Sequence, residues 1–108
     1  MAARMKVQVS SKVRLRLGVI LLEGRWLFGE RVASKLLEGF QRYMELLSQN
    51  PYMGPAEPLL LDMPGGYRGL CIHKHYKVIY RVEGNEIYVV DIWDTRQEPK
   101  RLVQGLNE

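Results

Sequence analysis

The sequence predicts an α+β fold in which two helices pack on one face of a small, mostly antiparallel, twisted sheet. Two long segments with apolar residues at helical spacing follow one short alternating segment near the start of the chain. A run of short strand-like segments then occupies most of the second half, which predicts the order β-α-α-β-β-β with one further short strand. The chain has 108 residues, enough for one hydrophobic core, so we expect a single domain over residues 1–108.

The first half of the chain predicts one strand and two helices. Apolar and polar residues alternate from Met5 to Ser10, which is typical of a short strand. Ser10 can cap a helix over residues 11–28, in which apolar residues recur every three or four positions. Gly29 separates it from a second helix over residues 30–48, which has an apolar stripe on one face. We expect the two helices to form an antiparallel pair across the sheet.

The second half of the chain predicts the rest of the sheet. Residues 51–58 contain three of the five prolines and indicate an extended loop. The three leucines at 59–61 favour a short strand. Glu83-Gly84-Asn85 is typical of a tight hairpin turn. Three further strands and a last helical turn are expected over residues 67–72, 76–82, 86–93 and 100–106.

The middle strand separates tyrosines from cations. Tyr76 and Tyr80 alternate with Lys77 and Arg81, so the two pairs lie on opposite faces. We expect the tyrosines to pack against the helices, because strand tyrosines are often core residues. The face that carries Lys77 and Arg81 is then expected to be open for a ligand or partner.

Fixed positive charges gather in one stretch. The chain has 16 Lys and Arg against 12 Asp and Glu, so its net charge is +4. Between Tyr67 and Val82 no acid occurs, and the cations are Arg68, Lys74, Lys77 and Arg81. Cations interleaved with tyrosines favour a surface that binds phosphates and bases, whereas a solvated sheet edge is the structural alternative.

One cysteine and two histidines lie in the same stretch. Cys71, His73 and His75 have the spacing of three zinc ligands on one strand face. A turn at Lys74 would break that geometry and no fourth ligand is evident, so we predict neither a metal site nor a cofactor. His75 is a candidate acid or base because imidazole titrates near neutral pH, and an exposed turn residue is the alternative.

Cysteine content and hydropathy indicate the compartment. The single Cys71 fits a reducing environment. No segment approaches the ~18 unbroken apolar residues that a membrane-spanning helix needs. We therefore expect a cytoplasmic protein that does not enter a membrane.

Several short motifs follow one another along the chain. They are Asn50-Pro51 with Gly54, Leu59 to Leu61, Tyr67-Arg68, His75 to Val82, Ile87 to Ile92, and Asp94 to Pro99. Their order and spacing, which cover nearly the whole chain, resemble the RelE/ParE toxin superfamily of bacterial type II toxin–antitoxin systems. No single motif is specific to this superfamily, but the whole series in this order is.

The resemblance implies two possible activities. RelE-like members cut messenger RNA on the ribosome without a metal, using basic side chains that stabilise charge on the phosphate. Arg68, Lys77 and Arg96 match these cations and are the predicted catalytic residues, with surface ion pairs as the alternative. ParE-like members instead bind DNA gyrase and lack the cutting residues. Further candidates for nucleic-acid contact are Arg81, Lys74, His75 and Trp93, of which Trp93 could stack on a base.

Two departures from the RelE-like pattern count against a nuclease. Leu70 stands where a lysine is expected two residues after Arg68, and no tyrosine or histidine follows Val103. We nevertheless predict a toxin that inhibits translation as an mRNA endoribonuclease, with gyrase inhibition as the alternative. The predicted partners are a cognate antitoxin and the ribosome with its mRNA, or DNA gyrase.

Overall fold

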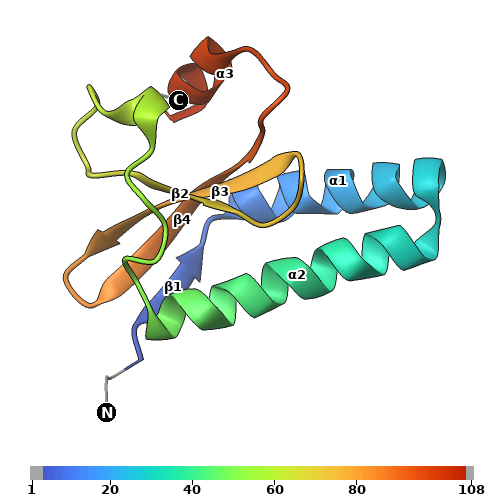
Figure 1. The fold of residues 1–108 in the computed structure, drawn as a ribbon, viewed down its shortest axis with the longest axis horizontal. Coiled ribbons are helices and arrows are strands. Elements are labelled where there is room, and N and C mark those ends of the chain that lie inside the picture. Colours follow the sequence, from blue (N-terminus) through green and yellow to red (C-terminus); the bar gives the residue numbers. More distant parts are fainter. Residues whose placement is uncertain (1–3, 107–108) are drawn as a thin grey trace.

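A computed structural model describes residues 4–106 and contains four strands and three α-helices in the predicted order (Figure 1). The α+β prediction is therefore confirmed. The elements are β1 (Lys6–Val9), α1 (Ser11–Phe28), α2 (Glu30–Gln49), a 3-10 helix η1 (Pro58–Leu60), β2 (Arg68–Cys71), β3 (Tyr76–Glu83), β4 (Glu86–Asp94) and α3 (Pro99–Leu106).

The four strands form one sheet in the order β1-β4-β3-β2. β1 runs parallel to β4, with Lys6 opposite Glu86, while the other two pairings are antiparallel. β4 is an inner strand, as its unbroken apolar run predicts. The turn between β3 and β4 contains Gly84 at a φ of 60°, a left-handed conformation that glycine adopts without strain.

The two long helices begin and end where local sequence signals predict. The Ser10 hydroxyl accepts a hydrogen bond from the Val13 amide at 3.2 Å and so caps α1. Gly29, at a φ of 92°, turns the chain into α2, which ends before Pro51. The helices lie side by side, and their hairpin extends beyond the sheet (Figure 1). None of the helices within residues 4–106 is long and apolar enough to cross a membrane.

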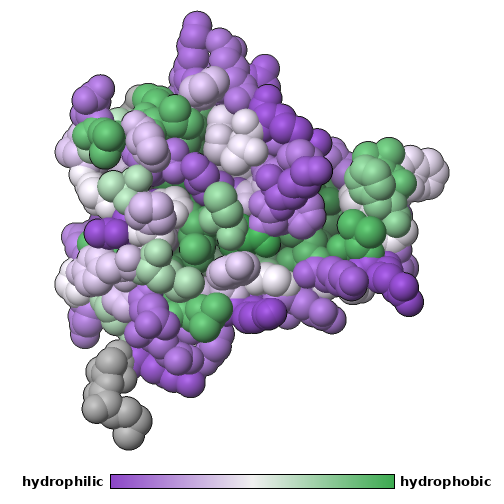
Figure 2. All heavy atoms as spheres, in the orientation of Figure 1, coloured by the Kyte–Doolittle hydropathy of each residue, from purple (hydrophilic) through white to green (hydrophobic). Residues whose placement is uncertain are grey.

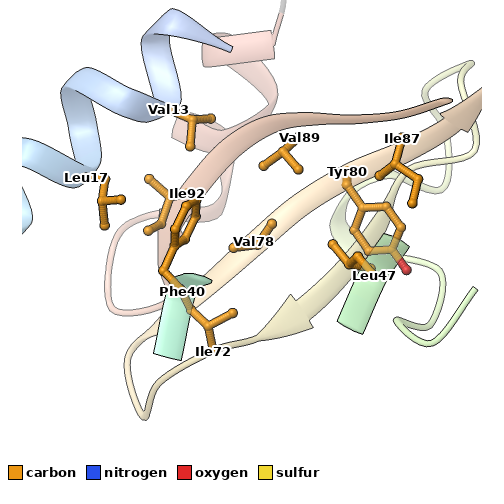
Figure 3. Packing of buried hydrophobic residues seen from close by; sticks show 10 residues of the cluster. All are labelled: Val13, Leu17, Phe40, Leu47, Ile72, Val78, Tyr80, Ile87, Val89 and Ile92. Atoms are coloured by element: carbon orange, nitrogen blue, oxygen red, sulfur yellow. The ribbon is translucent and has the colours of Figure 1, made fainter. Parts of the chain in front are cut away.

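The main core lies between the helical pair and one face of the sheet (Figure 3). Tyr80 is fully buried there, and Tyr76 packs at the edge of the same cluster, so the prediction for these tyrosines is confirmed. Burial of each large side chain stabilises the fold by about 1.5–3 kcal/mol. The buried members are Val13, Leu17, Phe40, Leu47, Ile72, Val78, Tyr80, Ile87, Val89 and Ile92.

The second face of the sheet is covered, so the expectation of an open cationic face was wrong. Leu60 of η1 and Leu102 of α3 pack over Ile79 and Trp93 and form a second buried cluster. The physical reason is that Ile79 shares the face of Lys77 and Arg81 and must be shielded from water. The predicted strand at residues 59–61 was also wrong, because Pro58 begins the short helix η1 instead.

Candidate functional site

Arg68, at the start of β2, fastens the preceding loop to the sheet. Its Nη1 atom donates a hydrogen bond to the Gly54 carbonyl at 2.7 Å, and its guanidinium carbon lies 4.9 Å from the centroid of the Tyr52 ring. The Gly54 amide in turn donates to the hydroxyl of buried Tyr80 at 2.9 Å. A Cβ at Gly54 would lie 2.7 Å from the Gly69 carbonyl oxygen, so a larger residue does not fit. The guanidinium of Arg68 is therefore engaged in holding the loop at Gly54.

Lys77 binds a buried carboxylate. Its Nζ atom lies 2.9 Å from Oε2 of Glu57, whose side chain is only 2% exposed. Gly69 makes room for this pair, because a Cβ there would overlap both side chains. A buried carboxylate is tolerated only when it is paired, so the charge of Lys77 is needed to stabilise Glu57.

Arg96 lies just after β4 and is the most exposed of the three predicted catalytic cations. Its Nε and Nη2 atoms lie 3.0 and 2.8 Å from the two carboxylate oxygens of Asp94. The Arg96 amide also donates to Asp94 at 2.9 Å. These hydrogen bonds hold the pKa of the Asp94 carboxyl below its ordinary value. The side chain of Arg96 is still 58% exposed.

His75 lies at the same end of the sheet as Arg96. Its carbonyl accepts a hydrogen bond from the Thr95 amide at 2.9 Å, which joins the start of β3 to the end of β4. Desolvation lowers the pKa of His75, and the charges of Arg96 and Lys74 lower it further. The lowered pKa favours the neutral imidazole, and the role of His75 as an acid or base remains a prediction.

The other predicted nucleic-acid contacts are dispersed. Arg81 pairs with Glu83 and lies 4.7 Å from the centroid of the Tyr88 ring. Lys74 is exposed in the turn between β2 and β3. Trp93 is 3% exposed within the second cluster, so the proposed base stacking does not fit its position.

The structure does not bring the three predicted catalytic cations together. In the register of β2 and β3, Arg68 lies opposite Tyr80, which belongs to the helix-side core. In the register of β3 and β4, Lys77 lies opposite Trp93, which belongs to the cluster on the other face. Cross-strand neighbours point to the same face, so Arg68 and Lys77 point to opposite faces. Arg96 lies beyond the end of β4.

A cleft of about 320 Å³ lies beside Arg96, between α1 and the end of the β3–β4 ribbon. It contains both signs of charge, since its lining includes Arg16, Arg101, Glu23 and Asp94. Carboxylates repel phosphate, so this mixed lining suits polar protein side chains better than a nucleic-acid backbone.

Asp91 anchors α1 to the sheet, a role that the sequence analysis missed. Its side chain is 1% exposed, and Oδ1 lies 2.8 Å from Nη1 of Arg16. Lys12 lies 3.8 Å from Oδ2 and donates to the Gly105 carbonyl at 2.8 Å, so it also holds α3. Desolvation raises the pKa of Asp91, while Arg16 and Lys12 oppose the shift. The available signal was one acid within an apolar strand, with basic residues on the first helix.

Cys71, His73 and His75 lie near one another in the chain but not as a set of ligands. β2 ends at Cys71, and the ring centroids of His73 and His75 lie 6.4 Å apart in the turn that follows. Within the described residues, no group of three His, Cys, Asp or Glu side chains is placed to hold a metal ion.

Comparisons with known proteins bear on the whole fold. No curated protein sequence matches the chain. A solved structure described as "Chromosomal ParDE TA system from P. aeruginosa" is similar, with a TM-score of 0.70 and 23% identity over 86% of this chain and 98% of that one. That likeness shows the fold. Residues 22–99 match the family model described as "ParE toxin of type II toxin-antitoxin system, parDE". The chain therefore belongs to the ParE toxin family of type II toxin–antitoxin systems.

Proposed function

We propose that this toxin acts by binding DNA gyrase and inhibiting it, without cutting RNA. Membership of the ParE family implies a cognate antitoxin. ParE-like members bind DNA gyrase, so gyrase is the expected target. The observation that carries the proposal is the separation of Arg68 and Lys77 on opposite faces of the sheet.

Cutting RNA without a metal needs fixed positive charges that converge on one phosphate. Such charges act only when they are aimed in advance at the position where negative charge develops. Here Arg68 holds the Gly54 carbonyl, and Lys77 neutralises Glu57. Moving Lys77 toward a phosphate would leave Glu57 buried without a partner, at a cost of about 3–5 kcal/mol.

The geometry favours a protein target over a nucleic acid. The cleft beside Arg96 contains both acidic and basic side chains, and Trp93 is buried rather than available for stacking. Complementary charges of both signs are typical of protein–protein contacts. Within this proposal, Arg96 contacts the target from the rim of the cleft.

The test compares two reactions with the same purified toxin. We expect gyrase supercoiling to stop, while messenger RNA in a translation extract keeps intact ends. Arg96→Ala should weaken gyrase inhibition at least about tenfold, equivalent to about 1.4 kcal/mol. Arg42→Ala, which removes an exposed cation from α2, is the matched control and should inhibit normally.

Codon-dependent RNA ends together with normal supercoiling would overturn the proposal and return the assignment to an mRNA endoribonuclease. Full gyrase inhibition by Arg96→Ala, with an unchanged melting temperature, would remove Arg96 from the contact.

A further inference from the structure

The carboxylate of Asp94 binds both the backbone and the side chain of Arg96. Oδ1 accepts hydrogen bonds from the Arg96 amide at 2.9 Å and from its Nε at 3.0 Å. Oδ2 accepts a hydrogen bond from Nη2 at 2.8 Å. Exposed ion pairs are often loose, but a bidentate contact holds an arginine in one orientation. The guanidinium of Arg96 is therefore ordered by a residue that lies two positions before it.

Asp94 is itself held by the sheet. It is the last residue of β4, and its side chain is only 21% exposed. Its carbonyl accepts a hydrogen bond from the Gln97 amide at 3.0 Å, and the Thr95 amide donates to the His75 carbonyl at 2.9 Å. A functional side chain supported by a strand is held more precisely than one on a free loop. Arg96 lies in a turn, but its orientation is set by the end of β4.

The contact with Asp94 uses one edge of the guanidinium. A guanidinium carries N–H donors on more than one edge. Asp94 occupies the edge formed by Nε and Nη2, whereas Nη1 and the second N–H of Nη2 form a different edge. Parallel N–H groups of this kind match the oxygens of a carboxylate. Because the side chain of Arg96 is 58% exposed, a carboxylate of another protein can reach it.

Arg96 lies beside the wall of the cleft between α1 and the end of β3–β4. Asp94 lies opposite Tyr76 in the register of these strands, and both residues line the cleft. Desolvation and the charge of Asp94 raise the pKa of Tyr76, while the nearby charge of Arg96 opposes the rise. Figure 2 shows mostly hydrophilic surface over the segment between β4 and α3, whereas hydrophobic surface lies near the end of the helical hairpin. The rim at Arg96 is therefore suited to a polar contact.

We propose that Asp94 is a positioning residue, which orients Arg96 toward a carboxylate of the target protein. The proposal rests on the proposed function, in which Arg96 contacts the target from the rim of the cleft. A mobile arginine loses rotamer freedom when it binds, which weakens binding by about three- to tenfold. Asp94 removes most of that loss, because it fixes the side chain before the target arrives.

Charge alone would give the opposite result when Asp94 is removed. The carboxylate of Asp94 offsets the charge of Arg96 and repels an acidic partner. Asp94→Asn raises the net charge of +4 by one unit, so a purely electrostatic contact with a carboxylate would become tighter. Positioning predicts weaker binding instead. The substitution keeps an oxygen that accepts the Arg96 amide and so preserves the turn, but its NH₂ group cannot accept a hydrogen bond from Nη2.

The first experiment compares the toxin concentrations that stop gyrase supercoiling. We expect Asp94→Asn to require about three- to tenfold more toxin than the wild type. Asp62→Asn, which adds the same charge at an exposed site in the turn after η1, is the matched control and should inhibit normally. Equal or stronger inhibition by Asp94→Asn would overturn the proposal.

The Arg96→Ala background separates positioning from a structural role of Asp94. If Asp94 acts through Arg96, adding Asp94→Asn to Arg96→Ala should cause no further loss of inhibition. A further loss as large as that in the wild-type background would show that Asp94 supports the fold or binds the target itself, which would also overturn the proposal.

The second experiment measures the order of Arg96 without any target. The heteronuclear NOE at Nε of Arg96 reports motion on the picosecond to nanosecond timescale. We expect a high value in the wild type and in Asp62→Asn, and a clearly lower value in Asp94→Asn. A low value in the wild type would show that Asp94 does not hold the guanidinium and would overturn the proposal.

Growth arrest on expression distinguishes failure of this proposal from failure of the proposed function. Wild-type toxin that arrests growth but leaves supercoiling intact would exclude gyrase as the target, and the same variants compared by growth arrest would still test Asp94. Weaker arrest by Asp94→Asn than by Asp62→Asn, at equal expression, would support positioning. Equal arrest by the two variants would overturn it.

Discussion

Replacing Lys77 with alanine tests whether its charge serves the fold or a reaction. The substitution leaves the Glu57 carboxylate 2% exposed and without the ammonium group that lies 2.9 Å away. Loss of one partner of a buried pair costs about 3–5 kcal/mol. Lys77 keeps 22% of its side chain exposed, which lets water reach the site, so we expect about 3 kcal/mol. For a domain of this size that lowers the melting temperature by at least about 10 °C.

A double-mutant cycle separates the pair from other effects of the substitution. Urea unfolding is measured for the wild type, Lys77→Ala, Glu57→Gln and the double variant at one pH. We expect the double variant to be more stable than Lys77→Ala alone, because it no longer buries an unpaired charge. The exposed Lys74→Ala is the matched control and should change stability by less than about 0.5 kcal/mol.

Two results would refute this reasoning. One is a loss of less than about 1 kcal/mol in Lys77→Ala, the range found for surface ion pairs. The other is strict additivity in the cycle, which would show that Lys77 and Glu57 do not interact. Either result would make Lys77 available for binding a phosphate and would weaken the argument against a nuclease.

Three further substitutions test local features. Gly54→Ala should destabilise the protein by about 1–3 kcal/mol in urea, because its Cβ would lie 2.7 Å from the Gly69 carbonyl oxygen; wild-type stability would contradict this. Tyr80→Phe leaves the buried Gly54 amide without its acceptor, so we expect a loss of about 1–3 kcal/mol and faster hydrogen exchange at that amide. Arg96→Ala should raise the pKa of Asp94 toward its ordinary value in an NMR titration. In the wild type that pKa is depressed, so the stability from Asp94 is present at neutral pH and lost as the pH falls through the native pKa; an unchanged titration would exclude the pairing.

Local patterns in the sequence determined the helices and most of the sheet. Ser10 supplies an N-cap oxygen, Gly29 adopts a positive φ, and Pro51 stops a helix. These effects depend on neighbouring residues in the chain and not on the tertiary structure. The strands follow from side-chain alternation, which is also local. The family could be recognised for the same reason, since its motifs are short segments in a fixed order.

Which side chains meet was decided only by the tertiary structure. Glu57 lies 20 residues from Lys77, and Asp91 lies 75 residues from Arg16, so no local pattern announces either pair. The sequence placed Arg68, Lys77 and Arg96 near one another along the ribbon, but cross-strand register sent the first two to opposite faces. Burial then selected Lys77 as the partner of Glu57 and Arg16 as the partner of Asp91, because a carboxylate excluded from water must be neutralised by whichever charge the fold brings within reach.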